Sequence, residues 1–295
     1  MAAPEGRRAG ALKVCFFASE KRRERLLADA FMRGLKAHGD TGFIQELDGE
    51  AQVADAEVAV MVGVKSREIF QANWQAGVHT VMIDKGYTRH RLSGPVKIWE
   101  YWRVAVDGHH PTRTLMATPR RRDRLKALCL PVAPWRRDGG HILIAGSSAK
   151  YHRFYGLDDP TSFSISLVRR LHRLTNRRIV YRPKPSWKEA VPIRGTEFSA
   201  GGQDVGAALK GAWAMVTHGS NACFEAALSG VPSIVLGDAV AKPISSTEIA
   251  DVANPYLAPA NERRQWLANL AYCQWTMHEF ESGAAWAVIR PQIYG

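Results

Sequence analysis

The stretch from Trp213 to Gly237 constrains the fold more than any other part of the chain. Its apolar runs, and the polar segment between them, predict a strand, a loop, a helix and a second strand at residues 214–217, 218–221, 222–228 and 233–236. Gly230 and Pro232 are placed to end the helix. Two strands joined through a helix pair in parallel, so the stretch predicts one unit of a parallel α/β sheet.

The loop at 218–221 has the composition of a phosphate-binding turn. Ser220 or Asn221 is a suitable N-cap for the helix that follows, and Glu225 falls in its first turn, where a carboxylate suits the positive helix end. Backbone N–H groups and a helix start that point to one place receive phosphate. Every αβ unit, however, needs a loop, a cap and a glycine. The loop is therefore a candidate anion site and not yet a specific one.

The order His-Gly-Ser, then Glu225-Ala-Ala, then Gly230-Val-Pro resembles the C-terminal signature of GT-B glycosyltransferases and their epimerase relatives. The resemblance implies that the loop holds the diphosphate of a nucleotide-sugar donor and that Glu225 holds its ribose. The donor-binding residues that it implies in the loop are His218, Gly219, Ser220 and Asn221. It further implies two Rossmann-like domains that face each other across a cleft.

Predicted strands and helices alternate along the rest of the chain. Before residue 100, strands are expected at 12–18, 42–47, 57–62 and 78–83, and helices at 19–36 and 67–75. Ser19 is the expected N-cap of the first helix. After residue 140, strands are expected at 141–145 and 177–181, and a helix at 162–174. This alternation predicts the α/β class with doubly wound sheets.

A proline- and glycine-rich break divides the chain, and it includes Pro131, Pro134, Gly139 and Gly140. We therefore expect an acceptor-side domain at 1–136 and a nucleotide-sugar-binding domain at 137–295. The GT-B resemblance implies that the C-terminal helix crosses back to the first domain. Residues 1–10 are expected to form a disordered leader.

The composition fits a cytoplasmic protein with an anionic partner. The four cysteines are isolated and no run of about 18 apolar residues occurs, which favours a reducing compartment and no transmembrane segment. Lys and Arg number 40 against 28 Asp and Glu, a net charge of +12. Such an excess favours nucleic acid, an anionic glycan, a membrane surface or a nucleotide as partner, with a solvated basic surface as the plain alternative.

Polar residues on the acceptor side follow the strand predicted at 78–83. Asp84 and Lys85 come directly after it, and ligands of open α/β sheets bind beyond the carboxyl ends of strands. An ordinary histidine titrates near neutrality, which makes His109 and His110 candidate acids or bases. Adjacent residues point to different sides, so a metal site is not expected at this pair. We expect Asp84 to be the catalytic base, with His109 or His110 as the next candidate for this role.

A second cationic element, Arg182-Pro-Lys184-Pro, follows the strand predicted at 177–181. It resembles the R-x-H-P element of capsule-type GT-B transferases, which contacts the donor phosphate. Lys184 stands at the His position, which keeps a cation and loses a titratable proton donor. The dinucleotide fingerprint GxGxxG is absent, so we expect no cofactor beyond a nucleotide-sugar co-substrate. The resemblance implies transfer without a bound metal.

Two acceptors are compatible with the sequence. The basic and aromatic segment from residue 99 to 124 and the net charge favour duplex DNA with 5-hydroxymethylpyrimidines, as in phage enzymes of GT-B type. The expected acceptor contacts are Lys85, Arg103, Arg120, Arg121 and Arg122. The alternative acceptor is a surface glycan, which the capsule-like elements favour.

Two other classes stay open. A non-catalytic nucleic-acid-binding α/β protein would use the same scaffold without binding nucleotide-sugars. A UDP-sugar epimerase is disfavoured, because no pair of well-placed carboxylates is found in the sequence.

Overall fold

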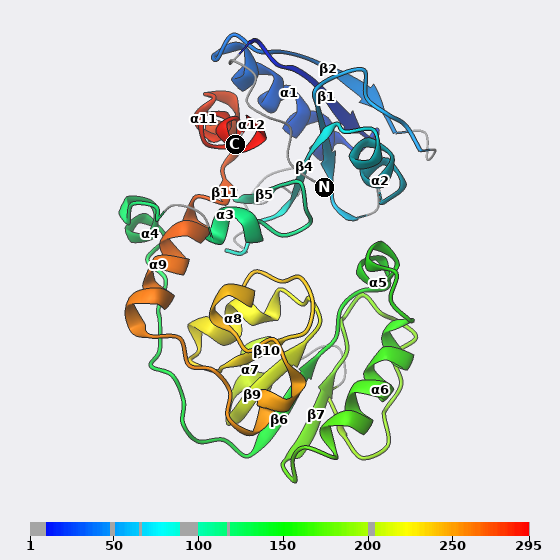
Figure 1. The fold of residues 1–295 in the computed structure, drawn as a ribbon, viewed down its shortest axis with the longest axis vertical. Helices are drawn as coiled ribbons and strands as arrows, with labels where there is room; N and C mark the ends of the chain where they lie inside the picture. Colours follow the sequence, from blue (N-terminus) through cyan, green and yellow to red (C-terminus); the bar gives the residue numbers. More distant parts are fainter. Residues whose placement is uncertain are drawn as a thin grey trace. The chain divides into compact units, whose positions relative to one another are not determined.

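The computed structural model describes residues 10–47, 51–64, 67–88, 100–116, 119–199 and 204–294. The chain forms two compact units: residues 1–118 with 270–295, called unit 1, and residues 119–269, called unit 2 (Figure 1). Each unit is a Rossmann-like α/β layer structure, which confirms the predicted fold class. The expected leader, apart from Gly10, and Trp99 of the aromatic segment lie outside the described residues.

Unit 1 is built on a six-stranded sheet with the order β11-β5-β4-β3-β1-β2. Its strands are β1 (Lys13–Ala18), β2 (Thr41–Glu46), β3 (Val58–Val62), β4 (His79–Lys85), β5 (Trp102–Val106) and β11 (Gln274–Trp275). The first four are parallel, and β5 pairs antiparallel to both β4 and β11. Its helices are α1 (Arg22–Lys36), α2 (Arg67–Gln75), α3 (Thr112–Met116), α10 (Met277–Glu281), α11 (Ala284–Ile289) and α12 (Pro291–Tyr294).

The core of unit 1 lies between the sheet and helices from both ends of the chain. Phe31 of α1 packs edge-on against Phe16 of β1 and Trp286 of α11, with ring centroids 5.7 and 5.5 Å apart. Fully burying side chains of this size contributes about 1.5–3 kcal/mol each. Helix α2 lies on the other side of the sheet (Figure 1). Amphipathic helices therefore cover both faces, as the continuous apolar runs of β1 and β3 require.

The N-terminus of α1 differs from the prediction. The helix begins at Arg22, its N-cap residue is Lys21, and no side chain caps it. The hydroxyl of Ser19 donates instead to the buried carboxylate of Glu24, at 2.6 Å. The predicted Ser19 cap is wrong because this hydroxyl is already engaged.

Unit 2 is built on a five-stranded, all-parallel sheet with the order β10-β9-β6-β7-β8. The strands are β6 (His141–Ala145), β7 (Arg178–Arg182), β8 (Glu197–Phe198), β9 (Ala212–Thr217) and β10 (Ser233–Val235). The α-helices are α4 (Asp123–Leu128), α5 (Ala149–Tyr155), α6 (Pro160–Leu171), α7 (Val205–Leu209), α8 (Ala222–Leu228) and α9 (Ala260–Ala271), which ends just past the unit. Two 3-10 helices, η2 (Lys242–Ile244) and η3 (Ile249–Ala253), follow β10.

The break expected at residue 136 falls inside unit 2. Residues 133–136 are hydrogen-bonded to the last residue of α8 and to the turn that follows the helix. Ala133 N–H donates to Leu228 O (2.8 Å), and Arg136 N–H donates to Gly230 O (2.7 Å). The prolines of this segment thus lie within unit 2 and not at the boundary between the two units.

The C-terminal residues 270–295 belong to unit 1, where Asp40 holds them. The fully buried carboxylate of Asp40 accepts hydrogen bonds from Trp286 Nε1 (2.6 Å), Arg290 Nε (2.8 Å) and the Leu12 amide (2.7 Å). Burial alone would raise the pKa of Asp40, but the hydrogen bonds from Arg290, Leu12 and Trp286 outweigh it and lower the pKa.

Within the described ranges, none of the helices has the length and apolar character needed to cross a bilayer.

We predict that Asp40→Asn lowers the free energy of unfolding of unit 1 by about 3 kcal/mol, because Arg290 loses a buried partner. A lowered folded-state pKa adds stability above the unfolded pKa of about 3.9, and this stability is lost as the pH falls through the folded value. The difference between wild type and variant in urea denaturation should therefore shrink below about pH 4.

Asp55→Asn is the control, since it breaks the exposed Lys13–Asp55 pair and should leave stability unchanged within error. An Asp40→Asn variant as stable as this control at neutral pH would show that Asp40 does not hold the C-terminal residues.

Candidate functional site

The carboxyl edge of the unit 2 sheet gathers most of the predicted donor residues. Because all strands of this sheet are parallel, the loops after β6, β7 and β9 leave the same edge, where ligands of open α/β sheets bind. The Gly146 amide donates to Arg182 O at 2.9 Å. A Cβ at Gly146 would lie 3.3 Å from Lys184 N, so the loop after β6 lies directly against Arg182 and Lys184.

Thr217, the last residue of β9, shapes the loop at 218–221. Its hydroxyl donates to Ala145 O of β6 at 2.8 Å and accepts from the Ser220 amide at 2.9 Å. The Ser220 amide is therefore consumed within the loop. Among the residues that the structure describes, the amides of Gly219 and Asn221 have no hydrogen-bond partner. These two amides can bind a ligand, although Gly219 is buried and Asn221 half-buried.

The start of α8 is capped only weakly. Asn221 is the N-cap residue, but its side chain makes no cap hydrogen bond, and Ser220 Oγ accepts from the Ala222 amide at 3.4 Å. Glu225 lies half-buried in the first turn, where the prediction placed it. The side chain of Asn221 is therefore not used to stabilise the helix.

His218 is held in one tautomer by an aromatic cluster. Tyr151 Oη donates to Asp238 O at 3.0 Å, so it accepts from His218 Nδ1 at 2.9 Å. The ring proton therefore lies on Nδ1, and Nε2 is left as an acceptor. Burial lowers the pKa of His218, which keeps the ring neutral at physiological pH. Tyr155 and Phe163 complete the cluster around this ring.

Tyr151 also closes one side of the loop. A Cβ at Gly219 would meet the Tyr151 hydroxyl oxygen at 1.8 Å, so only glycine fits there. The cavity beneath the ends of β6 and β9 has a volume of about 10 Å³, room for about one water. A ligand therefore has to contact the outer side of the loop, since the inner side is filled.

The sequence prediction missed Tyr151 and Tyr155. Two tyrosines four residues apart on the helix after β6 lie on one face of that helix, which was the available signal. Their partner Asp238 is distant in sequence, and only the fold brings it to the hydroxyl of Tyr155, at 2.9 Å.

Four of the predicted acceptor-side residues of unit 1 form a largely buried cluster around Arg103. Arg103 lies opposite Asp84 in the pairing of β4 and β5, and its Nη2 donates to Asp84 Oδ2 at 3.1 Å. The same guanidinium contacts His109 Nε2 and His110 Nδ1, each at 2.7 Å, and the Tyr87 hydroxyl at 3.4 Å. The structure thus brings together Asp84, Arg103 and both histidines.

Arginine can only donate, so each contacted imidazole nitrogen must be an acceptor. His109 Nε2 and His110 Nδ1 are therefore unprotonated, and their lone pairs are already used. Burial, followed by the charge of Arg103, lowers the pKa of both rings well below the ordinary histidine value. The base role expected for His109 and His110 does not fit this geometry, because neither ring has a lone pair for an acceptor proton.

Asp84 remains as the candidate base. Its side chain is 32% exposed, and its second oxygen, Oδ1, accepts from the Lys85 amide at 2.7 Å. Burial alone would raise the pKa of Asp84, but the charge of Arg103 and the Lys85 hydrogen bond outweigh it and lower the pKa. Asp84 is therefore an ionised carboxylate that Arg103 orients.

The predicted acceptor contacts divide between the units. Arg103 is 2% exposed, so the predicted contact of this side chain with DNA is wrong: its guanidinium is inside the core of unit 1. Lys85 is exposed in unit 1, whereas Arg121 and Arg122 are exposed in unit 2, just before α4. Arg120 beside them is anchored, since its amide donates to Asn269 Oδ1 at 2.8 Å.

No three His, Cys, Asp or Glu side chains gather as a metal site in the described ranges.

Comparison with known proteins identifies the fold. No family model and no curated protein matches the chain. Among solved structures, the chain is similar to the β-Kdo 2,7-transferase of KpsC from Thermosulfurimonas dismutans, with a TM-score of 0.53 and 14% identity over 94% of this chain and 99% of that one. The β-Kdo 2,4-transferase of the same KpsC gives a TM-score of 0.52 and 11% identity over 88% and 91%. The chain has the GT-B fold, as the resemblance at 213–237 predicted.

We predict that Gly219→Ala lowers the free energy of unfolding by about 2 kcal/mol, because the new methyl group overlaps the Tyr151 hydroxyl. The penalty should largely disappear in a Tyr151→Ala background, so urea denaturation of both single variants and the double variant should show strong non-additivity.

Gly140→Ala is the matched control, since nothing lies within 4 Å of a Cβ at that position. Equal penalties for Gly219→Ala with and without Tyr151 would contradict the packing described for the loop.

Proposed function

We propose that the protein is a glycosyltransferase that moves a sugar from a nucleotide-sugar donor to a hydroxyl acceptor. The observation that carries the proposal is the gathering of Arg182, Lys184 and the loop at 218–221 at the carboxyl edge of the unit 2 sheet, in a chain with the GT-B fold. Departure of a nucleotide phosphate develops negative charge, and cations and amide donors at this edge would stabilise it.

The donor would be held through three kinds of group. Arg182 and Lys184 supply positive charge, and the amides of Gly219 and Asn221 supply donors to phosphate oxygens. His218 is neutral, and its Nε2 can accept a hydrogen bond. We therefore infer that it accepts a hydrogen bond from a hydroxyl group of the nucleotide-sugar and does not contact a phosphate. The GT-B resemblance assigns the ribose to Glu225.

Asp84 would act as the general base. As the acceptor oxygen bonds to the anomeric carbon and the bond from that carbon to the leaving phosphate breaks, the acceptor proton passes to the Asp84 carboxylate. A carboxylate with a lowered pKa is a weak base, so proton transfer would occur late, when the hydroxyl has become acidic. Arg103 holds Asp84 in place for this step.

The acceptor we favour is a carbohydrate hydroxyl. The observation in its favour is that both solved structures described above are transferases of the sugar Kdo. The second candidate is a 5-hydroxymethylpyrimidine in duplex DNA, which the charge of +12 and the exposed Arg121 and Arg122 favour.

The first experiment measures thermal stabilisation of the protein by a panel of nucleoside mono- and diphosphates. We expect at least one nucleotide to raise the melting temperature. The double variant Arg182→Gln with Lys184→Gln should weaken binding of that nucleotide by about a hundredfold or more, because two hydrogen bonds to a charged group are removed, each contributing about 1.5–3 kcal/mol. Lys210→Gln, on the exposed end of α7, is the control and should bind as wild type does. No stabilisation by any nucleotide would favour a non-catalytic binding protein.

The second experiment supplies the sugar forms of that nucleotide with oligosaccharides or hydroxymethylated duplex DNA and follows product mass. Asp84→Asn should lose about 10²–10⁴-fold in transfer rate while nucleotide binding is retained. A mass gain on DNA alone would select the second acceptor. Conversion of the donor sugar without transfer would show an epimerase and overturn the proposal.

A further inference from the structure

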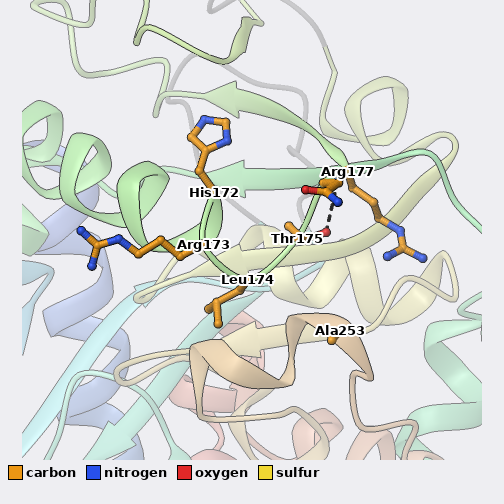
Figure 2. A pocket seen from close by; sticks show the side chains of 7 residues that line it. His172, Arg173, Leu174, Thr175, Arg177 and Ala253 are labelled. Carbon is orange, nitrogen blue, oxygen red and sulfur yellow. Dashed lines mark hydrogen bonds between the residues drawn. The ribbon is translucent and has the colours of Figure 1, made fainter.

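A basic groove lies at the opposite edge of the unit 2 sheet from the proposed donor site. It consists of three adjoining depressions of about 560, 600 and 500 Å³ around the end of α6, the loop that leads to β7, and residues 192–197. His172 lines all three. Figure 2 shows the first of them, with His172 among its lining residues. The groove reaches Arg178, the first residue of β7, whereas Arg182 at the donor edge is the last, roughly 13 Å further along the strand.

The lining of this groove is strongly positive. Its arginines are Arg169, Arg173, Arg177, Arg178 and Arg194. Its one carboxylate, Glu197, pairs with Arg178. The remaining four arginines therefore face solvent-filled space with no carboxylate among the other lining residues.

The dipole of α6 explains only part of this charge. Arg169 lies in the last turn of that helix, where cations offset the negative helix end. Arg173, Arg177 and Arg194 lie beyond the helix, so the dipole does not account for them. The guanidinium of Arg177 is held 4.0 Å from the ring centroid of Trp213, which orders this side chain at some entropic cost.

The arrangement of the charges matches an extended ligand and not a single anion. In Figure 2, Arg173 and Arg177 extend to opposite sides of the depression instead of converging. Arg194 belongs to a third chain segment, next to Gly195, where a Cβ would lie 2.7 Å from His172 Nε2. Charges spaced along a groove suit a polymer whose own charges are spaced.

We propose that this groove binds an acidic polysaccharide. Guanidinium groups bind carboxylates in bidentate fashion, and Thr175 and Asn176 supply polar groups for hydroxyls. Ile165, Val168 and Ile193 form an apolar floor for the hydrocarbon face of a sugar ring. None of the residues that line the depressions is Phe, Tyr or Trp, and the nearby Trp213 ring already stacks against Arg177.

The choice of a polysaccharide over other polyanions rests on the proposed function, because a carbohydrate acceptor supplies such a polymer. The groove would then hold a distant part of the acceptor chain. Binding itself does not depend on transfer and can be measured without it.

The test measures fluorescence anisotropy of labelled polygalacturonate, a carboxylated polysaccharide, at low ionic strength. Arg173→Gln with Arg194→Gln should weaken binding about tenfold or more, since two charge contacts are lost and screening is weak at low ionic strength. The control, Arg137→Gln with Arg264→Gln, removes two exposed arginines elsewhere in unit 2 and should change the affinity by less than about twofold. Neutral dextran should not bind.

Equal weakening by the groove and control pairs would show binding through net charge and overturn the proposal, as would no binding of polygalacturonate by wild type. Tighter binding of duplex DNA than of polygalacturonate, lost in the groove pair, would overturn the choice of a polysaccharide. Sugar transfer to a short acceptor should be unaffected by the groove pair. If the wild-type protein binds polygalacturonate but transfers no sugar, the proposed function is refuted, whereas the proposal that the groove binds an acidic polysaccharide still stands.

Discussion

The proposed donor site depends on the hydroxyl of Thr217, which links the end of β6 to the loop after β9. It donates to the last residue of β6 and accepts from the amide of Ser220, so one side chain sets both the spacing of two strands and the bend of the loop after β9. A hydroxyl is suited to this position because it donates and accepts at once. With the Ser220 amide engaged and Tyr151 filling the space beside Gly219, the loop presents the amides of Gly219 and Asn221.

In unit 1, Arg103 organises its surroundings in a similar way, because its guanidinium can only donate hydrogen bonds. A buried guanidinium needs several acceptors, and it finds them in one carboxylate, two imidazoles and a phenol. The arrangement forces both histidines to be neutral and uses their lone pairs. It also leaves Asp84 ionised, oriented and partly exposed, and it is on this geometry that the proposed role of Asp84 as general base rests.

Much of the fold could be predicted from the sequence, because its signals are local. The apolar runs of β3, β6 and β9 and the helix end at Gly230 and Pro232 are each contained within a few residues, and the structure places them within one or two residues of the prediction. Helix α6 was expected to begin at residue 162, but Asp159 caps it and Pro160 opens it. That signal was available in the sequence and was overlooked.

The rest of the site depends on contacts between distant segments. Nothing near Arg103 in sequence shows that it is buried, since its partners come from β4 and from the residues after β5. The pairing of Tyr151 with His218 joins residues 67 positions apart. The basic groove likewise combines α6, the loop before β7 and residues 192–197, and no single segment of these carries a recognisable motif.

Backbone hydrogen exchange with and without a bound nucleotide tests the central claim most directly, because it reports on the two amides from which the proposed donor site is built. With the nucleotide that stabilises the protein, the account predicts slower exchange at Gly219 and Asn221 and unchanged exchange at residues 172–177, across the sheet. Unchanged exchange at Gly219 and Asn221 under saturating nucleotide, or protection confined to residues 172–177, would contradict it.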